Sequence, residues 1–229
     1  MSILSATPGT PLRAAQADAT NALATALTGA PAQECPALPC AGKILVSACL
    51  LGQAVRYDGG AHGPFTQLLD WQAQGRVLPL CPEVAGGLPT PRPAAEIIGG
   101  QGAQVLDGLV QVRSRDGADV SAAFIAGAEI AERLVQQHGI RIAVLKARSP
   151  SCGNRHSYDG SFSGTLVAGE GVTAAALRRL GVQVFNESEL SEAAQALRLL
   201  ESRARRRAAE AALFRCRGGV DQDAATDGA

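Results

Sequence analysis

Four short apolar runs set the strongest limit on how this chain can fold. They are four to six residues long and occupy residues 44–48, 77–80, 140–145 and 182–185. Runs of this length and composition are typical of strands that are buried on both faces of a sheet. Segments with helical patterns separate them, and strands that alternate with helices build mostly parallel sheets with right-handed crossovers. We therefore predict an α/β fold with a mostly parallel sheet covered by helices.

The helical segments are identified by their apolar period and by the residues at their ends. Residues 64–74 and 171–181 predict two short helices, each ending at a glycine. Residues 120–138 predict a long helix, with Asp119 as its cap. One face of the long helix carries the apolar side chains of Phe124, Ala128, Ala131 and Val135.

Two local signals concern the strands. Pro79 has no backbone N–H to give to a neighbour, so the run 77–80 is expected at a sheet edge or at a bend. Asp107 and Gly108 form a dipeptide typical of tight turns, which predicts a β-hairpin over residues 104–112.

The two ends of the chain differ in composition from its middle. Residues 1–42 are rich in Ala, Thr and Pro and predict a flexible leader, residues 43–187 predict the folded domain, and residues 188–229 predict a C-terminal helix and tail. The C-terminal helical pattern carries a group of arginines, which indicates either a solvated face or a surface for phosphate groups. We favour the solvated face for this group: Arg198, Arg203, Arg205, Arg206 and Arg207.

The overall composition argues against several classes of protein. The net charge is zero and aromatic residues make up 3% of the chain, which does not suit a general nucleic-acid coat. No segment approaches the roughly 20 apolar residues that cross a bilayer, and no secretion signal is recognisable. We expect a cytoplasmic protein, with no membrane partner, whose six cysteines are reduced. Lys146 is of some interest because the chain contains only two lysines.

Three cysteines follow predicted strands. Cys49, Cys81 and Cys152 come after the first, second and third apolar runs. Ligands of open parallel sheets bind outside the carboxyl ends of the strands, so these residues can meet there in spite of their distance in sequence. Three thiolates suit a soft metal or an iron–sulfur cluster, and a cubane held by three thiolates keeps one iron open as a Lewis acid. A zinc ion, a single nucleophilic cysteine and inert buried thiols are the alternatives.

Two polar residues lie close in sequence to these cysteines. Glu83 is two residues beyond Cys81 and is a candidate general base, although a solvated loop carboxylate would have the same pattern. Ser149 is three residues before Cys152 and can hydrogen-bond a substrate or a water, although Ser-Pro also initiates turns. We expect His62 and His156 to be exposed loop residues rather than ligands.

Four sequence blocks together resemble the thiouracil desulfurase family. They are VSACLLG at residues 46–52, VRYDG at 55–59, LCPEVAGGLPTPR at 80–92 and LKARSPSCG at 145–153. The similarity runs in continuous order over about residues 43–187. It implies a Rossmann-like α/β domain with a [4Fe-4S] cluster on Cys49, Cys81 and Cys152, and catalytic roles for Glu83 and Ser149. In the family, the substrate sulfur binds the open iron, water replaces it at carbon, and the sulfur leaves as hydrosulfide without a redox change.

The resemblance leads to one main hypothesis and its rivals. The main hypothesis is desulfuration of a thiolated pyrimidine, 4-thiouracil or its nucleotide or nucleoside, with thiolated RNA as a second substrate class. The first rival is a non-catalytic sensor that binds an iron–sulfur cluster or zinc. The second is a structural α/β protein with buried free thiols. We expect the chain to be the short form of the family, with an added leader and with a C-terminal helix and tail after residue 187.

Overall fold

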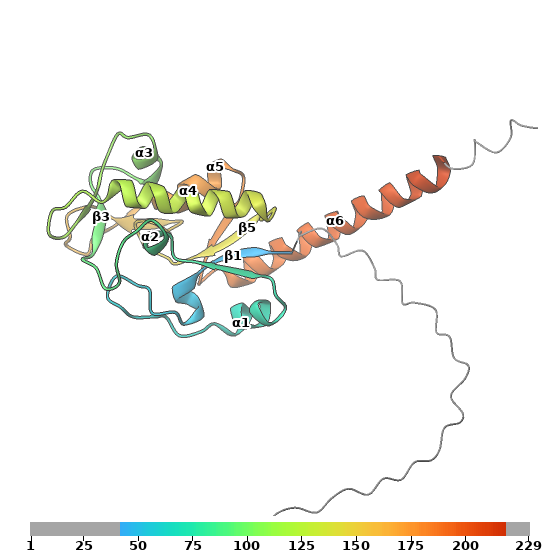
Figure 1. Cartoon of the computed structure of the whole chain (residues 1–229), viewed down its shortest axis with the longest axis horizontal. Coiled ribbons are helices and arrows are strands. Elements are labelled where there is room, and N and C mark those ends of the chain that lie inside the picture. Colours follow the sequence, from blue (N-terminus) through green and yellow to red (C-terminus); the bar gives the residue numbers. More distant parts are fainter. Residues whose placement is uncertain (1–41, 219–229) are drawn as a thin grey trace, which may run out of the picture. The chain divides into compact units, whose positions relative to one another are not determined.

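A four-stranded parallel sheet forms the centre of the fold (Figure 1). The computed structural model describes residues 42–218, so the predicted leader, apart from Gly42, and the last part of the predicted tail lie outside it. The strands are β1 (Ile44–Ser47), β2 (Val77–Leu80), β5 (Ile142–Leu145) and β8 (Gln183–Asn186), in the order β2-β1-β5-β8. All four apolar runs are therefore strands, and the α/β prediction is confirmed. The strand with Pro79 lies at an edge, as predicted.

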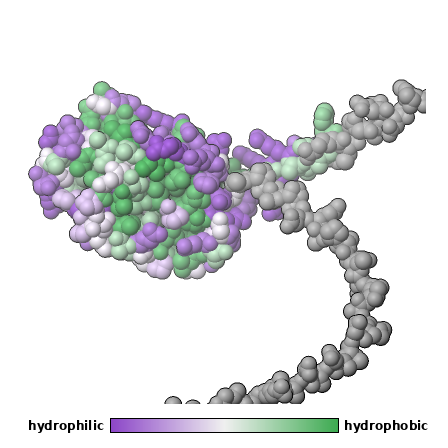
Figure 2. Space-filling model, viewed as in Figure 1, coloured by the Kyte–Doolittle hydropathy of each residue, from purple (hydrophilic) through white to green (hydrophobic). Residues whose placement is uncertain are grey.

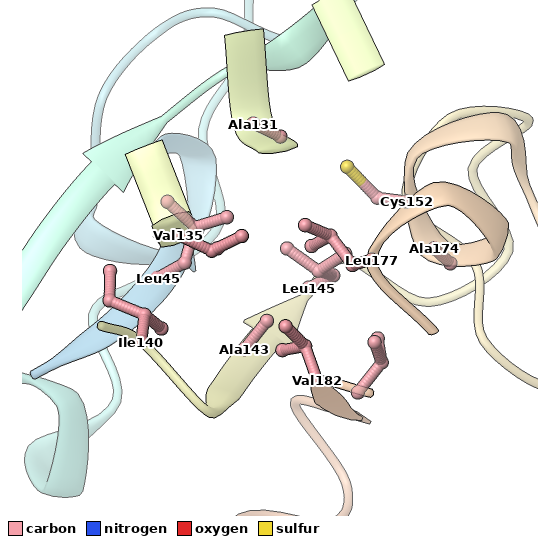
Figure 3. Close-up of a cluster of buried hydrophobic side chains, with 11 residues drawn as sticks. Leu45, Ala131, Val135, Ile140, Ala143, Leu145, Cys152, Ala174, Leu177 and Val182 are labelled. Carbon is pink, nitrogen blue, oxygen red and sulfur yellow. The ribbon is translucent and has the colours of Figure 1, made fainter. Parts of the chain in front are cut away.

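Alternation of side chains along β1 and β5 divides the core into two layers, one on each face of the sheet. Leu45 and Leu145 pack with α4 (Ser121–Gln137) and α5 (Val172–Arg179) on one face, in the cluster that Figure 3 shows. Ile44 and Val144 pack on the other face with α1 (Thr66–Ala73) and the first turns of α6 (Leu190–Gly218). Each strand of the centre is thus covered on both sides, which explains its continuous apolar sequence.

Two smaller sheets and two short helices lie in the long connections. β3 (Ala95–Ile97) pairs with β4 (Val112–Ser114), and β6 (His156–Tyr158) pairs with β7 (Leu166–Ala168), both in antiparallel fashion. The short helices are α2 (Pro82–Ala85) and α3 (Gly102–Leu106), and a 3-10 turn, η1 (Ala48–Leu51), follows β1. Neither antiparallel pair was predicted from the sequence.

The predicted hairpin over residues 104–112 is wrong. The segment begins as α3, because the Gln104 side chain accepts the backbone N–H of Gln101 and Val105 is buried in an apolar cluster with Phe124 and Val172. The Asp107–Gly108 dipeptide ends this helix, with Gly108 at a left-handed φ of 72°. Residues 112–114 pair with Ala95–Ile97 instead.

The remaining helix predictions agree with the structure to within a few residues. Asp119 accepts the backbone N–H and the hydroxyl of Ser121, the first residue of α4, although Val120 occupies the capping position itself. The apolar face predicted for this helix is buried. α6 continues to Gly218, and Figure 2 shows hydrophilic residues along the part of it that is drawn in colour. No helix among residues 42–218 is both long enough and apolar enough to span a bilayer.

Two glycines allow α2 to touch α4 closely. A β-carbon on Gly127 would lie 2.1 Å from the Pro82 carbonyl oxygen, and one on Gly86 would lie 2.0 Å from the Ala123 carbonyl oxygen. Real contacts of this kind are never so short, so a side chain at either position would push the helices apart. α2 begins directly after Cys81 and contains Glu83, so this contact sets where both residues stand.

We predict that Gly127→Ala lowers the free energy of unfolding by about 2 kcal/mol, because the added methyl group overpacks the contact between α2 and α4. At an open helix position the same substitution would stabilise the protein by roughly 1 kcal/mol. Gly63→Ala is the matched control, since its β-carbon would meet nothing within 4 Å. Urea unfolding of the full-length protein measures both variants. Equal stability of Gly127→Ala and the native protein would contradict the packing described.

Candidate active site

The three cysteines after the strands come together at one edge of the sheet. Cys49 lies in η1 directly after β1, Cys81 directly follows β2, and Cys152 lies in the loop after β5. These three strands are neighbours in the sheet, and their carboxyl ends open into one cavity of about 400 Å³. All three cysteines line it, together with Glu83 and Ser149. The structure therefore gathers all five predicted site residues, while their roles stay predictions.

Each sulfur has a different local environment. The Cys49 and Cys152 residues are 8% and 5% exposed, whereas Cys81 is partly buried. The Cys152 sulfur is 3.5 Å from the hydroxyl of Ser47, and the Cys81 sulfur is 3.7 Å from the carbonyl oxygen of Val55. The thiols are free, with no disulfide between them.

Ser149 and Glu83 are joined by a hydrogen bond across the cavity. The Ser149 hydroxyl oxygen accepts the backbone N–H groups of Ser151 and Cys152, both at 3.1 Å, which fixes the turn that presents Cys152. Because both of these groups are donors, the hydroxyl proton is free to go to Oε1 of Glu83, 3.2 Å away. Arg148, directly before Ser149, has a left-handed φ of 62°, a backbone strain that often marks functional sites.

Arg92 holds the other oxygen of Glu83. Its Nε and Nη2 atoms donate to Oε2 at 2.8 and 2.6 Å, and its Nη1 atom donates to the carbonyl oxygens of Val55 and Pro89. The side chains of Arg92 and Glu83 are 5% and 14% exposed, so the pair is largely shielded from water. Glu83 is thus an oriented, paired carboxylate and not the solvated loop residue that the sequence left open.

A second ion pair lies beside Cys49. Nζ of Lys146 is 2.5 Å from Oε1 of Glu187, and the other oxygen of Glu187 accepts the backbone N–H of Ala147. Burial pushes the pKa of Glu187 upward, but these hydrogen bonds and the charge of Lys146 outweigh it and hold the pKa below its usual value. Lys146 lines the cavity, so a positive charge stands beside the thiols.

Burial raises the pKa values of all three thiols. The pKa of Cys49 rises from 9.0 to about 11 because of burial and the nearby Cys81. Burial also raises the pKa of Cys81, and raises that of Cys152 in spite of the hydrogen bond from Ser47. Without metal the thiols are protonated at neutral pH, so metal uptake must release protons from them.

The histidines are not part of the thiol group. His62 lines the cavity, accepts a hydrogen bond from Arg56 and is partly buried, so it is less exposed than predicted. Burial and the charges of Lys146 and Arg56 lower the pKa of His62. His156 is exposed but lies in β6 and not in a loop.

Within residues 42–218, no three His, Cys, Asp or Glu side chains are close enough to ligate one shared metal ion. A cubane cluster binds each thiolate through a different iron, so its ligands stand farther apart than those of one zinc ion. The absence of such a group among these residues therefore does not count against a cluster.

Sequence reasoning missed Ser47, Arg92 and Glu187. Arg92 ends the sequence block 80–92 that contains Cys81 and Glu83, and Ser47 lies in the block 46–52 that contains Cys49. Their position in these two blocks was the sequence signal that could have identified them. Glu187 had no such signal, because it reaches the site only through the pairing of β8 with β5. The five arginines of α6 do not line the cavity.

The fold and the site define an α/β protein with a thiol-lined cavity at the carboxyl edge of its sheet. The family model described as 2-thiouracil desulfurase matches residues 44–189, and the chain belongs to this family. The uncharacterized protein YbbK of Bacillus subtilis (strain 168) is 39% identical over 149 residues, which are 65% of this chain and 98% of that protein. Among solved structures, the [4Fe-4S]-dependent thiouracil desulfidase TudS is 54% identical, with a TM-score of 0.62, over 69% of this chain and 98% of that one.

We predict that Arg92→Met lowers the free energy of unfolding by about 3 kcal/mol, because it leaves the Glu83 carboxylate shielded from water without its charged partner. Arg133→Met is the control. Its ion pair with Glu129 is 3.9 Å long and more than half exposed, so its loss should cost less than about 1 kcal/mol. Denaturant unfolding of the metal-free proteins measures both changes. Equal losses in the two variants would contradict a shielded pair at Glu83.

The raised pKa of Cys49 predicts a pH-dependent contribution to stability. Below pH 9 the Cys49 thiol is neutral in both the folded and the unfolded chain. Between pH 9 and about 11 this thiol ionises only in the unfolded chain, so the free energy of unfolding falls as the pH rises. The stability difference between the native protein and Cys49→Ser should shrink by about 2 kcal/mol over this range. Unfolding of the metal-free proteins at a series of pH values measures it. A constant difference would show that the thiol is not shielded.

Proposed function

We propose that this protein is a [4Fe-4S]-dependent desulfurase that converts a thiolated pyrimidine, 4-thiouracil or its nucleotide or nucleoside, to the oxo form. The observation that carries the proposal is the convergence of Cys49, Cys81 and Cys152 in one cavity that also holds the Glu83–Ser149 hydrogen bond. Membership of the 2-thiouracil desulfurase family and the similarity to TudS support the same activity.

The donor set fits such a cluster. Three thiols that follow neighbouring strands would supply ligands to three irons of a cubane and would leave its fourth iron without a protein ligand. When bound, the cluster supplies a Lewis acid for the thiocarbonyl sulfur of the substrate. Cys49 and Cys152 are buried and held by the turns after β1 and β5, so the ligands are oriented before any metal binds.

Glu83 is the proposed general base. The overall exchange replaces the C=S bond of the substrate by a C=O bond whose oxygen comes from water. The two protons of the water leave with the sulfur as hydrogen sulfide, or as hydrosulfide and a free proton. No electrons are gained or lost. Glu83 takes the first proton from the attacking water, Arg92 fixes the direction of the carboxylate, and Ser149 donates its hydroxyl proton to the same group.

The cavity favours a small substrate. Its volume of about 400 Å³ is in the range of small-molecule sites, and the cluster and the substrate must share it. We therefore place free thiopyrimidines, nucleosides and nucleotides ahead of thiolated RNA. A cytoplasmic location suits the free thiols of the site, since the cytosol keeps thiols reduced.

Anaerobic reconstitution with iron and sulfide, followed by an assay of hydrosulfide release from 4-thiouracil and 4-thiouridine monophosphate, tests the function. The native protein should bind iron and release hydrosulfide, and Cys49→Ala, Cys81→Ala and Cys152→Ala should each lose both properties. Iron and sulfide contents and product formation are the readouts. Full turnover by Cys49→Ala would overturn the proposal.

Glu83→Gln separates catalysis from cluster binding. The variant should keep the iron and sulfide content of the native protein and lose about 100-fold or more in turnover, because general acid–base groups contribute at least this much. Glu129→Gln, an exposed carboxylate on α4, is the matched control and should change neither. If the native protein binds a cluster but releases no hydrosulfide from either compound, a sensor becomes the better explanation.

A further inference from the structure

Ser47 is the last residue of β1 and is 2% exposed. Its hydroxyl oxygen accepts the backbone N–H of Lys146 at 3.0 Å, and the same hydroxyl lies 3.5 Å from the Cys152 sulfur. The residue therefore connects the end of β1, the end of β5 and one of the three thiols. It lines the cavity with little of its own surface exposed.

The partners of Ser47 determine where its proton points. A backbone N–H can only donate, so the bond from Lys146 uses an acceptor position of the Ser47 oxygen and leaves the hydroxyl proton free. The Cys152 sulfur is the acceptor within reach. A thiolate is a stronger acceptor than a thiol, so ionisation of Cys152 on metal binding strengthens this bond.

The other two cysteines have no hydroxyl donor among the hydrogen bonds of residues 42–218. The Cys81 sulfur lies 3.7 Å from the carbonyl oxygen of Val55, and hydrogen bonds from the backbone N–H groups of Val84 and Glu83 lower its pKa against the effect of burial. Among the three thiols, Cys152 is therefore the one whose donor is a side-chain hydroxyl, which a single substitution removes. Burial disfavours the charge on this sulfur most strongly, and the Ser47 hydroxyl partly offsets that cost.

We infer that Ser47 is a positioning residue for the Cys152 ligand, whose hydrogen bond withdraws charge from the thiolate and so raises the reduction potential of the cluster. The inference rests on the proposed function, because it takes Cys152 as a cluster ligand. Hydrogen bonds to ligand sulfur stabilise the reduced cluster more than the oxidised one, since the reduced form carries one more negative charge. The same withdrawal of charge makes the open iron a better Lewis acid.

The test compares four anaerobically reconstituted proteins: native, Ser47→Ala, Ser47→Thr and Ser151→Ala. Ser151 is the matched control, because it is fully buried beside Cys152 but its hydroxyl bonds to Thr173 and not to sulfur. Reductive titration followed by electron paramagnetic resonance gives each potential. Ser47→Ala should shift to a more negative potential at unchanged iron and sulfide content, Ser47→Thr should recover the native value, and Ser151→Ala should keep it. An unchanged potential in Ser47→Ala overturns the inference.

A second measurement keeps the inference testable if Ser47→Ala fails to fold or to hold iron. Resonance Raman spectra of the native holoprotein in H2O and D2O detect hydrogen bonds to the thiolate sulfurs through isotope shifts of the iron–thiolate stretching bands. The shifts should be present in the native protein and in Ser151→Ala, and their absence from the native spectrum overturns the inference. If the native protein binds no cluster at all, the proposed function has failed, which is a different result from equal potentials in loaded proteins.

Discussion

Parallel pairing of β1 with both of its neighbours is the constraint on which the site depends. Ser47 of β1 pairs with Leu80 of β2, so Cys49 and Cys81 leave the sheet at nearly the same level. On the other side, Val46 pairs with Val144 of β5, and the chain turns after that strand toward Cys152. A shift of register by two residues in either pair would move one thiol by more than 6 Å along the sheet and separate the three sulfurs.

At the carboxyl edge of the sheet, the buried thiols lie close to charged side chains that are held in ion pairs. Apolar clusters on both faces reach the thiols, with Cys152 in one cluster and Cys49 in the other, and burial raises the pKa values of both. Two ion pairs lie there: Arg92 with Glu83, and Lys146 with Glu187. Pairing of this kind keeps the carboxylates oriented in a place where unpaired charges would be costly.

The sequence predicted the central sheet and the gathering of the thiols, because both follow from strong, local patterns. Apolar runs identify buried strands, and the position of each cysteine after a run identifies the edge where they meet.

The short helices and strands were harder to predict from the sequence. The Asp107–Gly108 dipeptide has the chemistry of a hairpin turn, but here it ends a helix whose Val105 is buried, so packing overrode the local signal. The strands β6 and β7 have three residues each, too few for a clear alternation of apolar and polar side chains. Long-range contacts such as Arg92 with Glu83, or Glu187 with Lys146, become visible only after the chain has folded.

The central claim is that Cys49, Cys81 and Cys152 together hold a cluster with one iron open to the cavity. Diffraction from anaerobically reconstituted crystals, recorded at the iron absorption edge, measures this most directly. The account predicts iron density in the cavity bonded to the Sγ atoms of all three cysteines, with the remaining iron facing Glu83 and free of protein ligands. Iron bound at another site, or a cluster whose fourth iron carries a protein side chain, would contradict it.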